Sequence, residues 1–232
     1  MSVKEKLPAL RLDRTRHAAP QVFERLRELI IALELAPGTV LPRPDLAERF
    51  GISQTPVRDA LLKLGEEGLV DIFPQHATVV SRIDVKAARQ AHFLRRSIEL
   101  EVVRELASHP DKALIAKLRA HVDVQAATMS PATFGEFAAA DQAFHRDMYE
   151  AAGVIELFDL VRRHSGHVDR LRRLHLPSEG KAQAVVRDHK RIVDAIAKGD
   201  AGVAQQRVRE HLSGTLSQVE EICRRYPEFV VL

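Results

Sequence analysis

Residues 45–70, with the sequence DLAERFGISQTPVRDALLKLGEEGLV, contain two short amphipathic segments separated by a very short break. In the first segment, apolar residues recur every three or four positions and share one face: Leu46, Ala47 and Phe50. Gly51 follows directly, as expected just beyond a helix C-terminus. Pro56 suits the first turn of a second helix, because its missing N–H would have no partner there. That helix has its own apolar stripe, formed by Val57, Leu61 and Leu64. The pattern predicts two helices joined by a tight turn.

The opposite face of the second helix carries hydrogen-bonding side chains in its first turn. They are Gln54, Thr55 and Arg58, with Ser53 available as the N-cap. The N-terminal turn is the part of a recognition helix that contacts base edges in the major groove. The positive end of the helix dipole lies there and favours nearby phosphate. The pair of helices is therefore interpreted as a helix-turn-helix that binds double-stranded DNA. A helical hairpin without a role in DNA binding is the alternative.

The flanking segments complete a larger unit. After Gly68 the period changes from helical to extended, in LVDIF and TVVS, which are separated by the polar break PQHA. This predicts a two-stranded wing. Upstream, an apolar stripe at helical spacing ends before Pro37 and Gly38. We therefore predict a winged-helix domain at residues 20–81, preceded by a flexible N-terminal arm at residues 1–19.

The run LAERFGISQTPVRDALLKLGEEGLV, followed by VDIFPQHATVV, resembles the N-terminal domain of the GntR family of bacterial transcription regulators. The resemblance implies that four residues face DNA, with Arg58 contacting a base: Arg43, Gln54, Thr55 and Arg58. Two positions depart from the family pattern. Gln54 stands where arginine is common, which affects the operator sequence. His76 stands at the wing tip where glycine is usual, which affects the turn and a minor-groove contact. A solvated loop histidine is the alternative for His76.

The composition is that of a globular protein large enough for two domains. The chain has 232 residues, of which 45% are hydrophobic and 29% charged. No apolar stretch approaches the ~20 residues that span a bilayer, and the N-terminus lacks the apolar run of a secretion signal. A single cysteine, Cys223, excludes an internal disulfide and is consistent with the cytoplasm. The net charge is only +3, so DNA affinity must depend on where the charges lie.

From Asp84 onward the pattern is helical and no strand pattern reappears. The fold class is thus mainly α, with an antiparallel bundle of about six helices forming an effector-binding domain at residues 82–232. Turn signals between the periodic segments place the helices near 84–108, 111–129, 132–151, 154–175, 179–198 and 201–225.

Four polar residues occupy apolar faces of these helices. Asp141 and His145 share one face of FAAADQAFHRDMY, and His189 and His211 lie on the stripes of two later helices. Any one of these histidines alone would be interpreted as a hydrogen-bonded core residue. Together they need a common explanation, and a divalent cation bound by one carboxylate and three imidazoles provides it.

The segments DQAFH, DHKRIVDAIAKGD and VREHL resemble the ligand-bearing motifs of the FCD domain, the all-helical C-terminal domain of the FadR subfamily. The resemblance implies that the metal ligands are Asp141, His145, His189 and His211. We expect zinc as the cofactor, with nickel or manganese as alternatives.

Two further residues are candidates for binding an effector. In LRRSIELE, Arg95 matches an arginine that the family places to meet an anionic ligand, and a guanidinium can bind a carboxylate through two parallel hydrogen bonds. A surface pair with Glu99 is the alternative. His164 shares an apolar stripe of the predicted helix 154–175 and could line the same cavity, unless it is an ordinary core histidine.

The sequence thus predicts a homodimeric transcription regulator, a repressor rather than an enzyme, that binds an imperfect palindrome. A small organic acid bound beside the metal would control operator affinity, and residues 81–85 would form the hinge. In one alternative, the metal ion is itself the signal. The other is a metal-dependent enzyme, which the lack of an H-E-x-x-H motif and the presence of a DNA-binding domain disfavour.

Overall fold

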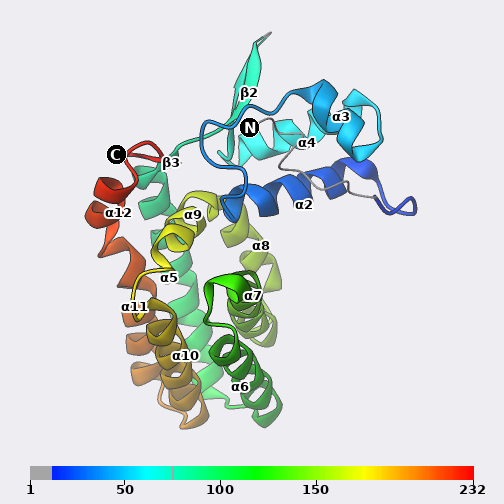
Figure 1. The fold of residues 1–232 in the computed structure, drawn as a ribbon. Coiled ribbons are helices and arrows are strands. Elements are labelled where there is room, and N and C mark those ends of the chain that lie inside the picture. The colour runs from blue at the N-terminus through cyan, green and yellow to red at the C-terminus, as the bar shows by residue number, and fades with distance from the viewer. Residues whose placement is uncertain (1–11, 75) are drawn as a thin grey trace. The chain divides into compact units, whose positions relative to one another are not determined.

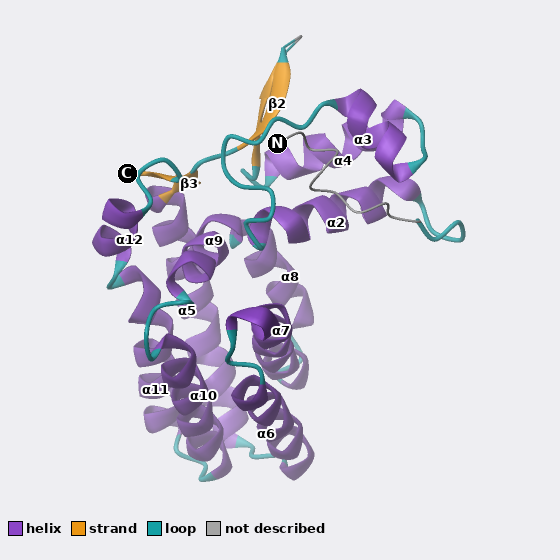
Figure 2. Cartoon of the chain, viewed as in Figure 1, coloured by secondary structure: helices purple, strands orange, loops and turns teal. Residues whose placement is uncertain are grey.

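A computed structural model describes residues 12–74 and 76–232. Most of the predicted arm therefore lies outside the described residues. The described part of the chain is mostly helical (Figure 2). It forms two compact units. The first contains the described residues up to Ala88 together with residues 166–173 and 221–232, and the second contains residues 89–165 and 174–220. The units thus differ from the predicted division at residue 81, because two late segments pack with the N-terminal part.

The first unit is built on three helices and a hairpin, as predicted (Figure 1). The elements are α2 (Ala18–Ile31), α3 (Arg43–Phe50), α4 (Gln54–Glu66), β1 (Val70–Phe73) and β2 (Ala77–Val80). Helix α4 packs against α2 and α3. The apolar residues predicted to face inward are buried between them, among them Leu26, Leu46, Val57 and Leu64. Strands β1 and β2 are antiparallel, with Val70 opposite Val80, and form the wing.

Two local features fix the geometry of the recognition helix. Gly51 ends α3 with a φ of 65°, a left-handed conformation that glycine adopts without steric cost. Arg27 on α2 bonds Glu67, at the end of α4, with 2.7 Å between Nε and Oε2. Both side chains of this pair are almost fully buried, so the ion pair fixes α4 against α2.

A second, parallel sheet joins the segment after the wing to the end of the described chain. Strand β3 (Ile83–Asp84) pairs with β4 (Val230–Val231), with Ile83 opposite Val230. The guanidinium of Arg82 donates hydrogen bonds to the backbone carbonyls of Pro227 and Val230. The prediction that no strand follows Asp84 was therefore wrong. A two-residue strand is too short to produce the alternating pattern by which strands are recognised.

The second unit is a helical bundle. Its elements are α5 (Val85–Ser108), α6 (Lys112–Ala127), the 3-10 turn η1 (Pro131–Thr133), α7 (Phe134–Ala151), α8 (Ile155–His164), α10 (Lys181–Ala197) and α11 (Ala201–Leu216). Helix α6 packs against α7 and α10, and α10 packs against α11. Their shared core includes Leu118, Phe144, Met148, Ile192 and Val208. No helix in residues 12–74 and 76–232 is long and apolar enough to cross a membrane.

Two predicted helices are each divided in the structure. The segment 154–175 breaks at Ser165 into α8 and α9 (Gly166–His175), where the Ser165 hydroxyl donates to the carbonyl of Arg162. Serine competes in this way with the helical backbone hydrogen bonds. The segment 201–225 breaks after Leu216, and α12 (Val219–Arg225) follows. The residues around this break include Ser213, Gly214, Thr215 and Ser217, which are weak helix formers.

Candidate metal centre and DNA-binding surface

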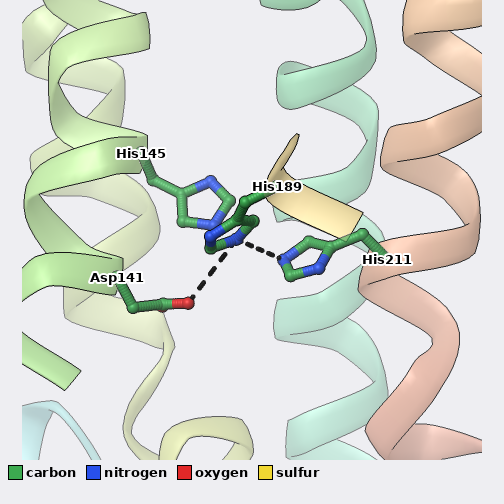
Figure 3. A group of neighbouring side chains, drawn as sticks. All are labelled: Asp141, His145, His189 and His211. Carbon is green, nitrogen blue, oxygen red and sulfur yellow. Dashed lines mark hydrogen bonds and ion pairs between the residues drawn. The ribbon is translucent and has the colours of Figure 1, made fainter. Parts of the chain in front are cut away.

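Three helices of the bundle bring the four predicted metal ligands together (Figure 3). Asp141 and His145 lie one turn apart on α7, while His189 comes from α10 and His211 from α11. All four residues are buried, and one ligand atom from each lies within 4.8 Å of the others. His189 and His211 are 22 positions apart in the sequence, and the packing of α10 against α11 brings them together. We call these four residues the interior cluster.

The ring nitrogens of the interior cluster point toward one another. Nε2 of His189 lies 3.2 Å from Nε2 of His211 and 3.7 Å from Oδ1 of Asp141. The ring of His145 stacks over that of His211, with 5.5 Å between centroids. Phe144 stacks on His189, with centroids 4.2 Å apart, and gives the cluster an apolar wall. The imidazole of His189 therefore has an apolar neighbour on one face.

The donor set fits a divalent cation. Nε2 of His145 is buried without a hydrogen-bond partner among the residues that the structure describes. An orphaned polar atom in the interior is costly. One carboxylate and three neutral imidazoles are suitable ligands for a borderline metal such as zinc. A cation among these four side chains would compensate the cost of the unpartnered His145 nitrogen.

Arg95 and Glu99 lie on α5 beside the interior cluster. Arg95 Nε donates to Glu99 Oε1 over 2.6 Å, and both side chains are buried, so the alternative of a surface pair was wrong. Glu99 Oε2 lies 3.2 Å from Nδ1 of His145. Burial opposes the charge of Glu99, but Arg95 and then His145 outweigh it and hold the pKa of Glu99 well below its usual value. Glu99 is thus an ionised carboxylate in the interior.

Further polar groups here were missed by sequence reasoning. Gln125, on α6, is fully buried and faces His189, and Tyr149, on α7, is also fully buried. The Tyr149 hydroxyl has no hydrogen-bond partner among the described residues, and its burial, followed by the charge of Glu99, raises its pKa. An isolated glutamine or tyrosine on a helix gives no sequence signal of such a role. Only the packing of α6 and α7 reveals it.

His164 does not take the place that was expected for it. Because α8 ends at His164 and the chain turns at Ser165, the residue leaves the apolar stripe that a continuous helix would have given it. Its side chain is exposed, so the prediction of a position facing the cavity was wrong. His167, just beyond this turn, is half-buried and accepts a hydrogen bond from the backbone N–H of Asp84.

The candidate DNA-binding residues lie at the N-terminus of α3, at the N-terminus of α4 and in the wing. Arg43 begins α3, Ser53 precedes α4, and His76 lies in the turn between β1 and β2. The remaining three occupy the first turn and a half of α4: Gln54, Thr55 and Arg58. All six side chains are exposed. Arg58 forms an ion pair with the exposed Asp59, 3.3 Å away, and an exposed pair of this kind is too weak to compete with a nucleic-acid partner.

The winged helix, with its exposed polar recognition turn and an attached helical bundle, defines a class of DNA-binding transcription regulators rather than enzymes. The model for bacterial regulatory proteins of the gntR family matches residues 18–80, and the FCD domain model matches residues 90–214. The chain therefore belongs to the GntR family and carries an FCD domain.

Similar proteins agree with this assignment. An HTH-type transcriptional regulator from an unstable DNA locus of Streptomyces ambofaciens is 35% identical over 207 residues, which span 89% of this chain and 87% of that protein. The HTH-type transcriptional repressor RspR of Escherichia coli is 28% identical, over 91% and 92% of the two chains. The solved structure of McbR/YncC from E. coli matches with a TM-score of 0.75 and 18% identity, over 91% and 99% of the chains. This last match concerns the fold alone.

Proposed function

We propose that this chain is a repressor of the FadR subfamily whose operator affinity is controlled by a small organic acid bound beside a divalent cation. The convergence of Asp141, His145, His189 and His211 carries the proposal. Zinc is the expected ion, with nickel and manganese as alternatives. When bound, a cation with an open coordination position acts as a Lewis acid toward a carboxylate oxygen. The relative RspR, which is named a repressor, supports the direction of control.

Arg95 is the residue that we propose for the acid's second contact. Its buried guanidinium bonds Glu99, and Glu99 in turn contacts the metal-ligand candidate His145. The planar set of N–H donors on a guanidinium suits a carboxylate. The buried hydroxyl of Tyr149 and the amide nitrogen of Gln125, both without a partner in the described part of the chain, could receive further oxygens of the acid. Because His164 is exposed, the proposed effector site does not depend on it.

For the DNA half, we propose a homodimer that binds an imperfect palindrome. One α4 per subunit would enter the major groove, with half-sites about one helical turn apart. Arg58 would contact a base, while Arg43, Ser53, Gln54, Thr55 and His76 would contact the surrounding DNA. The acid would favour one conformation of the protein over another, and a coupling free energy of about 1–3 kcal/mol would change operator affinity about 5- to 150-fold.

The test is a thermal-unfolding screen of metal-depleted protein, first with Zn²⁺, Ni²⁺ or Mn²⁺ and then with small carboxylates. A ligand at 100 times its Kd stabilises the folded protein by about 2.7 kcal/mol. We expect a metal-dependent acid response in the wild type, loss of it in His189→Ala, and retention in His109→Ala, whose side chain is 79% exposed. An acid response without metal, or an unchanged response in His189→Ala, would contradict the proposal.

A second function is favoured by one observation. Four protein ligands already complete the tetrahedral shell that zinc adopts in structural sites, which would leave no open position for an acid. In that case the metal ion itself would be the signal. Operator binding would then change on chelation and on refilling with zinc in the absence of any organic acid, and no carboxylate would shift the melting temperature of the metal-loaded protein.

A further inference from the structure

Each histidine of the interior cluster has an oxygen atom near its Nδ1, and the three oxygens come from three different helices. Oε2 of Glu99 on α5 lies 3.2 Å from His145 Nδ1, and Oε1 of Gln125 on α6 lies 2.7 Å from His189 Nδ1. The third, Oδ2 of Asp188 on α10, lies 3.9 Å from His211 Nδ1. Asp188 is half-buried, whereas Glu99 and Gln125 are fully buried.

We infer that Glu99 and Gln125 are positioning residues that hold the Nδ1 protons of His145 and His189 and so direct both Nε2 lone pairs toward one cation. This inference rests on the proposed metal site. A neutral imidazole carries one proton, and an oxygen acceptor near Nδ1 favours the tautomer with the proton on that nitrogen. Nε2 is then left as the ligand atom. Outer partners of this kind orient the ring and raise the basicity of the ligating nitrogen.

The positioning role is easier to test for Gln125 than for Glu99, because Gln125 is uncharged. The contact of 2.7 Å between its Oε1 and His189 Nδ1 is the shortest of the three. On the other side of the same ring, Nε2 faces His211 and Asp141. The proton therefore belongs on the Gln125 side, and the lone pair on the side of the cluster. An apolar residue in place of Gln125 would remove this preference without leaving a buried charge.

Glu99 acts through charge as well as position. Its Oε1 accepts from Arg95, and its Oε2 faces His145, so Arg95 fixes the carboxylate that in turn orients the imidazole. Neither ring nitrogen of His145 makes a hydrogen bond of good geometry among the described residues, so Glu99 Oε2, 3.2 Å from Nδ1, acts on the ring through its charge and leaves Nε2 available to a metal. Replacing both charged partners with apolar residues of similar volume is often neutral for stability, because it also removes the desolvation cost of the pair.

The first experiment measures Zn²⁺ affinity by competition with a chelator, in the full chain, for Gln125→Met, Gln125→Glu and Gln183→Met. Gln183 is exposed on α10 and serves as the matched control. We expect Gln125→Met to lose about 10- to 100-fold in zinc affinity, while Gln125→Glu, which keeps an oxygen acceptor, retains it. A purely packing role predicts the reverse order, because methionine fits an apolar site and a buried carboxylate does not.

The second experiment uses the double variant Arg95→Met with Glu99→Met. We expect weaker zinc binding by a similar factor, with little change in the melting temperature of the metal-free protein. The absorption spectrum of the Co²⁺-loaded protein should change in the double variant and in Gln125→Met, because it reports the ligand arrangement. Equal zinc affinities and identical cobalt spectra in wild type and variants would overturn the inference.

Zinc binding by the wild type and by His189→Ala separates a missing metal site from missing positioning roles of Gln125 and Glu99. If the wild type and His189→Ala bind zinc equally weakly, the proposed metal site is absent and the inference falls with it. If the wild type binds zinc and His189→Ala does not, the site stands. In that case, unchanged affinity in Gln125→Met and in the double variant refutes only the positioning roles of Gln125 and Glu99.

Discussion

Arg170 donates a hydrogen bond from Nη1 to the backbone carbonyl of Ser81 over 2.7 Å, and both residues are buried. Its Nη2 lies 3.2 Å from the Ser81 hydroxyl, which in turn donates to the carbonyl of Gly68. Burial lowers the pKa of Arg170 to about 10, so the side chain remains charged at neutral pH. The segment 81–85, predicted as a hinge, is therefore hydrogen-bonded to α9 within the first unit.

We expect Arg170→Met to destabilise the protein by about 1–3 kcal/mol, because the buried carbonyl of Ser81 loses its partner. The measurement is urea unfolding followed by circular dichroism. Arg172→Met is the control on the same helix, since the ion pair of Arg172 with Asp169 is partly exposed and its loss should cost about 0–1 kcal/mol. Equal destabilisation by the two variants would mean that the hydrogen bonds of Arg170 add nothing beyond a surface contact.

Gly166 provides a second test of the same packing. A Cβ at this position would lie 2.6 Å from Cδ2 of Leu69, which is fully buried and cannot move freely. Gly166→Ala should therefore destabilise the protein by about 1–3 kcal/mol through overpacking. An added Cβ at Gly135, in the first turn of α7, meets no described atom within 4 Å, so Gly135→Ala should stabilise the helix slightly, by less than the about 0.5–1 kcal/mol expected in a helix interior. Thermal unfolding of both variants should give shifts of opposite sign; a shift of the same sign would count against the steric argument.

Much of the first unit was predictable because its signals are local. The apolar spacing in 45–70, Gly51 at the helix end and the change of period after Gly68 each depend on a few neighbouring residues. The structure confirms the three helices and the wing. The contacts of residues 166–173 and of β4 with this unit involve residues up to about 150 positions apart, and no short pattern encodes them.

The interior cluster was predictable for a different reason. Asp141 and His145 share a helix face by spacing, His189 and His211 lie on the apolar stripes of two later helices, and the resemblance to the FCD domain assigned all four as metal ligands. The residues behind them were not predictable in the same way. Glu99 was recognised only as a partner for Arg95, and Gln125 gave no signal, because the contact of each with an imidazole depends on how α5 and α6 pack against the ligand-bearing helices.

His167 should make stability depend on pH. Burial, and then the charge of Arg170, lowers the pKa of His167 to about 4, whereas an unfolded histidine titrates near 6.5. Between these values the unfolded chain binds the extra proton, so stability falls as pH decreases from about 6.5 toward 4. From pH 7 to pH 5 this residue should cost about 1–2 kcal/mol.

The measurement compares melting temperatures of wild type and His167→Asn from pH 7.5 to pH 5. An asparagine oxygen can still accept the hydrogen bond from the Asp84 N–H, but it does not titrate. The wild type should therefore lose more stability than the variant as pH falls. Parallel curves for the two proteins would show that His167 is not held neutral by its surroundings.

Arg58 should distinguish specific from non-specific binding. Its exposed guanidinium in the first half of α4 can bond a guanine edge through two donors, so Arg58→Ala should weaken binding to the operator by about 1–3 kcal/mol. Binding to random DNA of the same length should change much less, because that contact carries sequence information. Fluorescence anisotropy at fixed salt measures both affinities. Arg224→Ala is the charge-matched control, since Arg224 is exposed on α12, outside the recognition helix. An equal loss on operator and random DNA, together with a smaller salt dependence, would instead assign Arg58 to a phosphate contact.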